Sequence, residues 1–150
     1  MPEERIHVFT VGFTKKSARD FFEKLAEAGV KRVVDVRLNK NSQLAGFSKR
    51  DDLKYFLQKI LGIEYVEAPL LAPTQSLLDT FKKNKGRWED YERDFLHLME
   101  ERRVEEKIEP SLLKSGCLLC SEDKPHQCHR RLVAEYLQSR WGNLEIKHIV

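Results

Sequence analysis

The segment IHVFTVGFTKKSARDFFEKLAEAGVKRVVDVR, residues 6–37, decides the fold of this chain. Its first part, residues 6–12, is rich in β-branched and aromatic side chains and predicts a strand. Apolar residues then recur at helical spacing over residues 21–28, and Gly29 is suited to end that helix. A second short apolar run, residues 31–37, predicts another strand. Strand, helix and strand with tight joints indicate two parallel strands joined by a right-handed crossover.

The same two patterns continue along the rest of the chain. Further strands are predicted over residues 63–66, 116–121 and 144–150, and further helices over residues 53–61, about 76–83, 88–104 and 127–140. No repeat, low-complexity tract or long linker separates them. We therefore predict a single α/β domain over residues 1–150, with a mostly parallel sheet of about five strands and helices on both faces.

Composition supports a globular chain and limits its partners. A length of 150 residues favours one domain, and 41% hydrophobic residues is typical of a folded protein. Charged residues reach 34%, which indicates a heavily solvated surface. The net charge is only +3, because 27 basic residues are nearly matched by 24 acidic ones. Such a balance gives weak support to nucleic-acid binding.

Cysteine usage and the chain start suggest a compartment. No run approaches the roughly 18 consecutive apolar residues that a membrane helix needs. The start, MPEERIHVFTVG, lacks a basic region followed by a long apolar stretch, so no signal peptide is expected. Three cysteines form an odd, low count that favours reduced thiols. We therefore expect a cytoplasmic protein without membrane association.

Polar side chains gather where the predicted strands end, and in parallel sheets ligands bind beyond those carboxyl ends. The candidates there are Gly12 and Thr14 after the first strand, Asp35 and Arg37 in the second, and Cys120 and Glu122 at the fourth. Asp35 is the most informative, because a carboxylate inside an apolar strand is costly unless it is paired. Arg37 points to the same face. A structural pair and a functional role are equally open for these two residues.

The segment CHR follows the fourth strand and begins a predicted helix. There Cys128, His129 and Arg130 occupy the first turn, where exposed N–H groups favour an anion. A thiol beside arginines at such a position ionises readily. Taken singly, Cys128 and His129 are more simply read as packed core residues. The combination, after a strand that ends in CSE, favours a functional site.

The cysteines also raise a metal site and a disulfide. Cys117 and Cys120 form a Cys-x-x-Cys pair, which Cys128 and either His126 or His129 would extend to four zinc ligands. Side chains three apart on a strand point to opposite faces, however, so no metal and no cofactor is predicted. A redox disulfide between Cys120 and Cys128 ranks below free thiols in a cytosolic protein.

Two surface segments offer weaker candidates. In the connection NSQLAGFSKR, residues 41–50, Phe47 would be able to stack on a flat ligand, although an ordered surface loop is the commoner outcome. A basic run, KKNKGRW over residues 82–88, is by default a solvated loop. Phosphate contact there is a further alternative, with little aromatic interleaving to support it.

Several of these segments resemble one known family in order and spacing. They are TVGFT (10–14), VVDVRLNKNSQLAGFSKRDDL (33–53), GIEY (62–65), CLLCSEDKPHQCHRRLVAEYL (117–137) and EIKHIV (145–150). The sequence resembles the prokaryotic family called Domain of Unknown Function 488 over nearly its whole length. The resemblance implies an α/β fold with the DVR and C-x-E…CHR motifs near one another. It implies no activity.

The residues favour an enzyme acting on a phosphate-bearing or nucleotide-like small molecule. Arg37, Arg130 and the helix N-terminus would hold the anion, with Gly12 and Thr14 beside them. The reacting groups would be an acid, Asp35 or Glu122, a thiolate, Cys120 or Cys128, and the imidazole of His129. The alternatives are a non-catalytic nucleotide or nucleic-acid binding module and a structural zinc site. Substrate, reaction type and oligomeric state stay open.

Overall fold

The computed structural model describes residues 5–39, 46–120 and 128–150. The candidate Glu122 and the first part of the 41–50 connection lie outside these ranges. Within them, no helix combines the length and the apolar character needed to cross a membrane.

The opening segment folds as the predicted strand, helix and strand: β1 (Ile6–Gly12), α1 (Ala18–Ala28) and β2 (Arg32–Asp35). Ser17 caps α1, because its Oγ accepts a hydrogen bond of 3.1 Å from the backbone N–H three residues on. Gly29 ends α1 in the left-handed conformation, with φ of 77°, which a residue with a side chain rarely adopts. Strand β2 ends two residues earlier than predicted.

The remaining elements follow in chain order. They are η1 (Gly46–Ser48), α2 (Arg50–Phe56), the π-helical turn η2 (Leu57–Leu61), β3 (Glu64–Glu67), η3 (Pro69–Leu71), α3 (Gln75–Lys82), α4 (Trp88–Arg102), α5 (Val104–Lys107), α6 (Pro110–Leu113), β4 (Gly116–Cys120), α7 (His129–Trp141) and β5 (Leu144–Ile149). Each of the five strands overlaps a predicted strand, with differences of at most two residues at the ends. The long charged helix predicted over residues 88–104 ends at Arg102, because Arg103 takes a left-handed conformation with φ of 53°.

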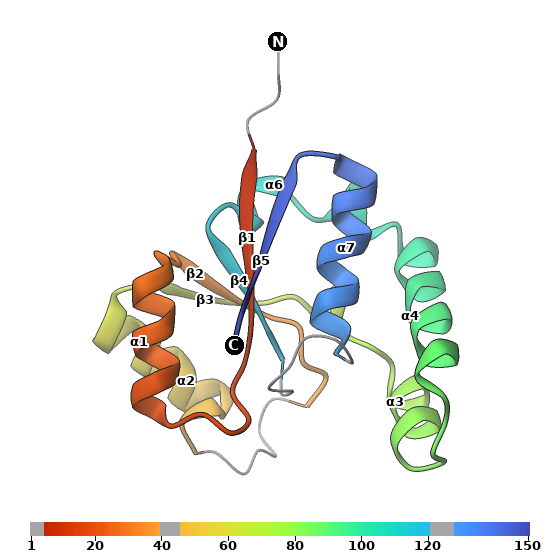
Figure 1. Ribbon diagram of the computed structural model, residues 1–150, viewed down its shortest axis with the longest axis horizontal. Helices are drawn as coiled ribbons and strands as arrows, with labels where there is room; N and C mark the ends of the chain where they lie inside the picture. The colour runs from red at the N-terminus through yellow and green to blue at the C-terminus, as the bar shows by residue number, and fades with distance from the viewer. Residues whose placement is uncertain (1–4, 40–45, 121–127) are drawn as a thin grey trace.

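The strands form one sheet in the order β3-β2-β4-β1-β5, and every neighbouring pair is parallel. The predicted fold class is therefore confirmed (Figure 1). Strand β4 enters between the two strands of the opening unit, so that Cys120 pairs with Gly12 on one side and Leu119 pairs with Asp35 on the other. All five residues of β4 are buried.

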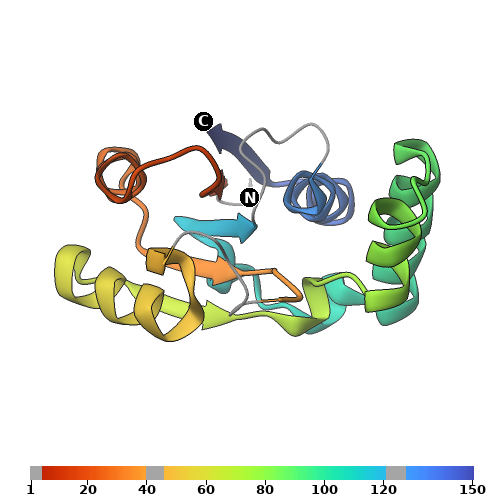
Figure 2. The ribbon, with the colours of Figure 1, turned by 90° about the horizontal axis from the view of Figure 1, so that it is seen from below.

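Helices cover both faces of the sheet, as Figure 2 shows. Helices α1 and α2 pack on one face, while α7 packs on the other with α4 and α3 farther out. Each face has its own apolar cluster. The cluster under α1 and α2 includes Phe13, Val33 and Leu119, and the cluster under α7 includes Val36 and Leu118. Successive residues of β2 and β4 thus alternate between the two clusters.

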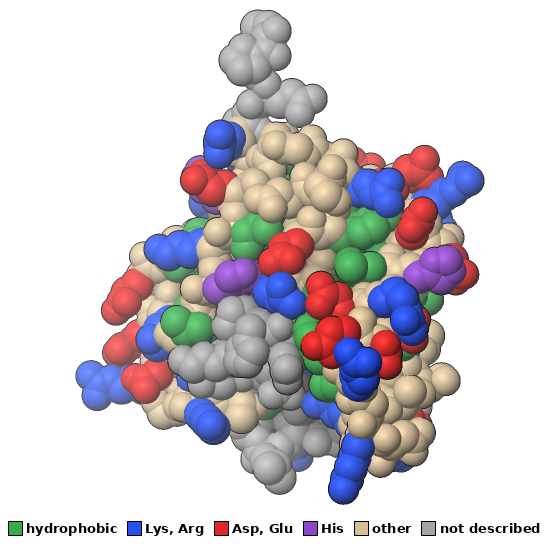
Figure 3. Space-filling model, turned by 45° about the vertical axis from the view of Figure 1, so that its right-hand side comes forward, with side chains coloured by type: hydrophobic (Ala, Val, Ile, Leu, Met, Phe, Trp, Pro, Cys, Tyr) green, Lys and Arg blue, Asp and Glu red, His purple; other side chains and the backbone are tan. Residues whose placement is uncertain are grey.

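The two weaker surface candidates have structural explanations. Phe47 is partly buried and packs against the rings of Phe21 and Phe22 on α1, at 5.4 and 6.0 Å between ring centroids. In the basic run, Lys83 lies 3.6 Å from the carboxylate of Asp79 and is exposed. On the face shown in Figure 3, acidic and basic side chains are interspersed, without a field of one sign.

Candidate functional site

The carboxyl ends of three neighbouring strands bring the two principal sequence motifs to one edge. The N–H of Val36, just beyond β2, donates a 3.2 Å hydrogen bond to the carbonyl of Leu119 in β4. On the other side of β4, Cys120 is in register with Gly12 at the end of β1. The DVR and CSE…CHR segments are therefore spatial neighbours because β4 lies between β1 and β2.

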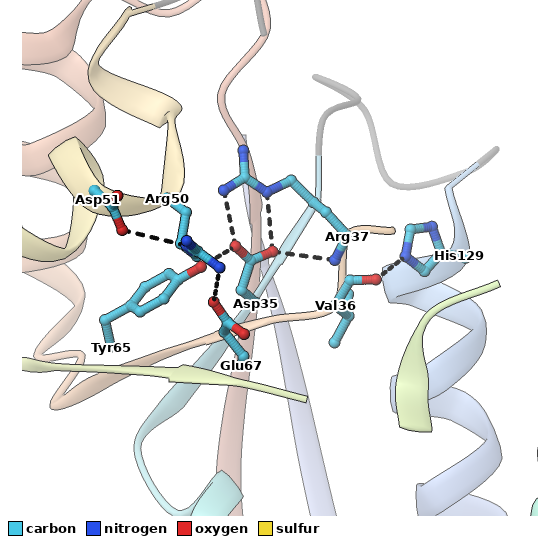
Figure 4. Close-up of polar contacts among 8 residues, drawn as sticks. All are labelled: Asp35, Val36, Arg37, Arg50, Asp51, Tyr65, Glu67 and His129. Atoms are coloured by element: carbon cyan, nitrogen blue, oxygen red, sulfur yellow. Dashed lines mark hydrogen bonds and ion pairs between the residues drawn. The ribbon is translucent and has the colours of Figure 1, made fainter. Parts of the chain in front are cut away.

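Asp35 and Arg37 form a buried, bidentate ion pair at the end of β2 (Figure 4). Nε of Arg37 donates to one carboxylate oxygen at 2.9 Å and Nη2 donates to the other at 2.8 Å. The backbone N–H of Arg37 adds a 3.0 Å bond, and the hydroxyl of Tyr65 in β3 donates at 2.5 Å. Both carboxylate oxygens of Asp35 are thus engaged by two donors each.

Burial also changes the pKa of Tyr65, one of the partners of Asp35. Burial, and then the hydrogen bond to the Asp35 carboxylate, raise the pKa of Tyr65, so that the phenol stays protonated and donates. Behind it, Arg50 in α2 reaches Glu67 in β3 at 3.5 Å. These contacts hold the carboxylate in one orientation, which in turn fixes the guanidinium of Arg37.

One nitrogen of Arg37 is left over by this arrangement. The whole Arg37 side chain is only 2% exposed. Its Nη1 is buried and finds no hydrogen-bond acceptor among the described residues. The guanidinium lies 5.5 Å from the centre of the Phe13 ring. In Figure 4, Nη1 points away from the Asp35 carboxylate. A buried cationic N–H without an acceptor is a natural contact for an anionic ligand.

His129 connects the two motifs directly. Its Nε2 lies 2.7 Å from the carbonyl oxygen of Val36, 93 positions away along the chain. Burial lowers the pKa of His129 to about 4, in spite of the opposing effect of this hydrogen bond. The ring is therefore neutral at pH 7. Because a carbonyl only accepts, Nε2 carries the ring proton and Nδ1 keeps a free lone pair.

Cys120 and Cys128 lie together beside this imidazole. The structure joins them in a disulfide, with their Cα atoms 7.5 Å apart, and both side chains are buried. The expectation of free thiols is therefore wrong for this pair. It fails because Cys120, at the end of β4, and Cys128, at the start of α7, lie on the same face of the sheet. Ligand atoms of the two cysteines and of His129 all lie within 4.8 Å of one another.

Arg130 adds a positive charge to the same cluster. This residue is fully buried in α7, and its Nη1 donates to Sγ of Cys120 at 3.4 Å. Cys128 is the N-cap residue of α7, where the helix dipole favours negative charge. Both effects would stabilise a thiolate once the disulfide is reduced.

Cys117 takes no part in this cluster. It belongs to the apolar cluster under α1 and α2, on the opposite face from Cys120. Burial raises the pKa of the Cys117 thiol, which keeps it protonated and unreactive. The Cys-x-x-Cys pair therefore does not converge, as the strand alternation predicts.

The same alternation divides the predicted single pocket into two clusters. Asp35 and Arg37 lie on the side of the sheet that α1 and α2 cover, whereas Cys120, Cys128 and His129 lie on the side that α7 covers. In Figure 4, Asp35 and Arg37 lie on one side of the end of β2 and His129 lies on the other, with Val36 between them. They meet only at the edge of the sheet, so a ligand that touches both must lie across the strand ends.

Both clusters lie within the part of the chain that matches a known protein family. The model of a family described as Domain of unknown function DUF488 matches residues 17–137. The chain belongs to the DUF488 family. Among the curated proteins and the solved structures, nothing matches it significantly. The description of DUF488 assigns no activity, so the function of this chain is argued from its site.

Sequence patterns did not single out some polar residues in or near the candidate site. Tyr65 stands in the GIEY segment and pairs with Val33, two residues before Asp35, and only the folded structure shows that its hydroxyl reaches the Asp35 carboxylate. Thr10 is buried in β1 and lies 2.6 Å from Nδ1 of His148 in β5. Burial, and then the charge of Arg130, lower the pKa of His148. Of the predicted anion-binding residues, Gly12 is buried at the edge, whereas Thr14 is exposed in the turn that follows.

Proposed function

We propose that this DUF488 chain is an enzyme that acts on a phosphate-bearing or nucleotide-like small molecule at the carboxyl edge of its sheet. The observation that carries the proposal is the buried Nη1 of Arg37, which lacks an acceptor among the described residues. Such a group costs about 1–3 kcal/mol when nothing accepts its hydrogen bond. A phosphate oxygen would satisfy it with a charge-assisted bond.

Asp35 acts in this proposal as a positioning residue. Four donors already occupy its two oxygens, so it has no free lone-pair direction from which to take a substrate proton. Its role is to orient the guanidinium of Arg37 toward the anion. Glu122, which lies outside the described residues, remains the proposed general base.

The reacting group comes from the cluster on the other face. The N-terminus of α7 and the guanidinium of Arg130 supply positive potential beside Cys120 and Cys128. The imidazole of His129 is neutral and held in one orientation by Val36. A substrate whose phosphate contacts Arg37 would extend across the strand ends to this cluster.

Binding to phosphate-bearing compounds provides the first test. The reduced protein is screened by thermal shift against inorganic phosphate, nucleoside phosphates and sugar phosphates, with the matching nucleosides and sugars as uncharged controls. We expect at least one phosphate-bearing compound to raise the melting temperature while its uncharged partner does not. Turnover of the stabilising compound is then followed by chromatography. If no phosphate-bearing compound stabilises the protein, the proposal fails.

Variants locate the binding and separate it from catalysis. Arg37→Lys keeps the charge but loses the fork of donors, so the stabilising compound should bind about 10-fold more weakly. Arg50→Lys is the matched control, because Arg50 is a partly exposed arginine in the adjacent network. His129→Gln should bind normally and lose turnover. A ligand that binds tightly and is never converted would instead indicate a non-catalytic binding module.

A further inference from the structure

We propose that the reduced protein binds one Zn²⁺ ion through Sγ of Cys120, Sγ of Cys128 and Nδ1 of His129. This inference deepens the proposed function, on which its catalytic meaning rests, by naming the group that reacts. Zinc binding itself is independent of any substrate. The donor set differs from a Cys-x-x-Cys site because Cys117 lies on the other face of the sheet.

The convergence of three ligand atoms is the first support. A tetrahedral zinc with Zn–S bonds of about 2.3 Å holds its ligand atoms about 3.8 Å apart. Here Sγ of Cys120, Sγ of Cys128 and a ring nitrogen of His129 all lie within 4.8 Å of one another. They come from the end of β4, the N-cap and the first residue of α7. Small side-chain rotations would place all three on one ion once the disulfide is reduced.

The spacing of the two cysteines also suits a metal. Their Cα atoms are 7.5 Å apart, whereas disulfides usually span about 4.4–6.8 Å. Two thiolates that share one zinc ion are held farther apart than two bonded sulfurs. The backbone separation at Cys120 and Cys128 therefore fits the longer bridge that runs through a metal.

His129 is oriented as a metal ligand would be. Metal-binding histidines commonly donate their second ring N–H to a carbonyl or carboxylate, which fixes the tautomer. The 2.7 Å contact from Nε2 to the Val36 carbonyl has this geometry and leaves the Nδ1 lone pair for the ion. Arg130 supplies the corresponding outer contact to Sγ of Cys120, at 3.4 Å.

The charges of the ligands are compensated when the metal is bound. Two thiolates and one Zn²⁺ sum to zero, so their burial avoids the cost of isolated charges. The set of two sulfurs and one nitrogen favours a borderline metal such as zinc over Mg²⁺ or Ca²⁺, which prefer oxygen. Three protein ligands are the number typical of catalytic zinc, whose fourth position takes water or a substrate oxygen. That position gives the site its reacting group.

Metal analysis tests the inference without a substrate. The disulfide is reduced with a phosphine, which supplies the two electrons, and each thiol loses its proton as it binds the metal. The metal-free protein is then titrated with ZnCl₂ against a chromophoric chelator. We expect about one tight equivalent per chain. With Co²⁺ instead, a thiolate-to-metal charge-transfer band and the intense d–d bands of a tetrahedral site should appear.

Matched variants identify the ligands. Cys120→Ser, Cys128→Ser and His129→Gln should each weaken zinc binding about 100-fold or more. The controls are Cys117→Ala, a buried cysteine on the other face, and His97→Gln, an exposed histidine on α4, and both should bind zinc like the parent chain. Circular dichroism checks that each variant is folded. Less than about 0.1 equivalent in the reduced parent chain, or equal binding by the ligand variants and the controls, overturns the inference.

The result is separable from the test of the proposed function. Phosphate-dependent stabilisation is measured on both the metal-free and the zinc-loaded protein. If phosphate compounds bind and zinc does not, the zinc site is wrong and the enzyme proposal stands with the cysteines as its thiols. If zinc binds and no phosphate compound does, the metal site stands and the proposed substrate class is wrong.

Discussion

At the scale of single residues, Asp35 is a carboxylate held in the interior of the protein. It is fully buried, and its charge is compensated by Arg37 through two parallel hydrogen bonds. Buried ion pairs add little net stability compared with apolar residues, but the loss of one partner leaves an uncompensated charge. The pair therefore serves to hold Arg37 in place more than to stabilise the fold.

Replacement of Asp35 tests this balance. Asp35→Asn keeps the size of the side chain but leaves the Arg37 charge buried without a counter-charge. We expect the free energy of unfolding to fall by about 3–5 kcal/mol, measured by urea denaturation. Asp51→Asn is the control, because it breaks an exposed pair with Arg50 and should cost at most about 1 kcal/mol. Equal losses in the two variants would contradict a special role for the buried pair.

His148 predicts a pH dependence of stability. Its pKa is lowered from the ordinary 6.5, because the folded state disfavours the charged ring. Its contribution is thus present above about pH 6.5 and is lost as the pH falls, since the unfolded chain then binds more protons. Urea unfolding at about pH 7.5 and about pH 5.5 should show the decrease, and His148→Gln should reduce it. His129, whose pKa is also lowered, accounts for a remaining slope. An unchanged slope in His148→Gln contradicts the assignment.

At the scale of elements, β4 determines the geometry of the site. It is buried along its whole length and pairs with both β1 and β2. Its start is closely packed, because a Cβ added at Gly116 would lie 2.9 Å from the carbonyl oxygen of Leu112. The carbonyl belongs to the backbone of α6 and Gly116 belongs to the buried strand β4, so neither segment can move cheaply.

A pair of glycine substitutions tests this packing. Gly116→Ala should reduce the free energy of unfolding by about 1–3 kcal/mol, as overpacking does elsewhere. Gly46→Ala is the control, because an added Cβ there meets no atom within 4 Å, and its effect should stay within about 0.5 kcal/mol. Thermal or urea unfolding of both proteins measures the difference. A neutral Gly116→Ala would show that the approach of α6 to β4 is easily relaxed.

At the scale of the whole molecule, the buried residues are concentrated in the two apolar clusters on the faces of the sheet, and the outlying helix α3 is less buried. Strand β4 is shared by both clusters, whereas α3 has no buried residue and packs mainly on α4. Stability in such a molecule is not uniform, because outlying elements open without global unfolding. Because β2 and β4 contribute to both apolar clusters, we expect the elements that form the site to be the last to open, which suits a site that must hold its groups in fixed positions.

Native-state hydrogen exchange measures this hierarchy. Amides of β1 and β4 should exchange only through global unfolding, while those of α3 should exchange at least about 10-fold faster through local opening. The rates are followed by mass spectrometry or NMR over a series of low denaturant concentrations. Protection of α3 equal to that of β4 would mean that the chain opens as one cooperative unit.

Local patterns in the sequence by themselves determined the elements, the parallel sheet and the edge at which the polar residues gather. This was possible because strand and helix periodicity are local, and because parallel strands end on one side. The strand order was decided only in three dimensions, since a crossover connection does not specify which neighbour a later strand takes. The insertion of β4 between β1 and β2 brings Leu119 beside Asp35 and Cys120 beside Gly12. Alternation along these strands then sends the Asp35 and Cys120 side chains to opposite faces, so that one predicted pocket became two clusters joined through Val36.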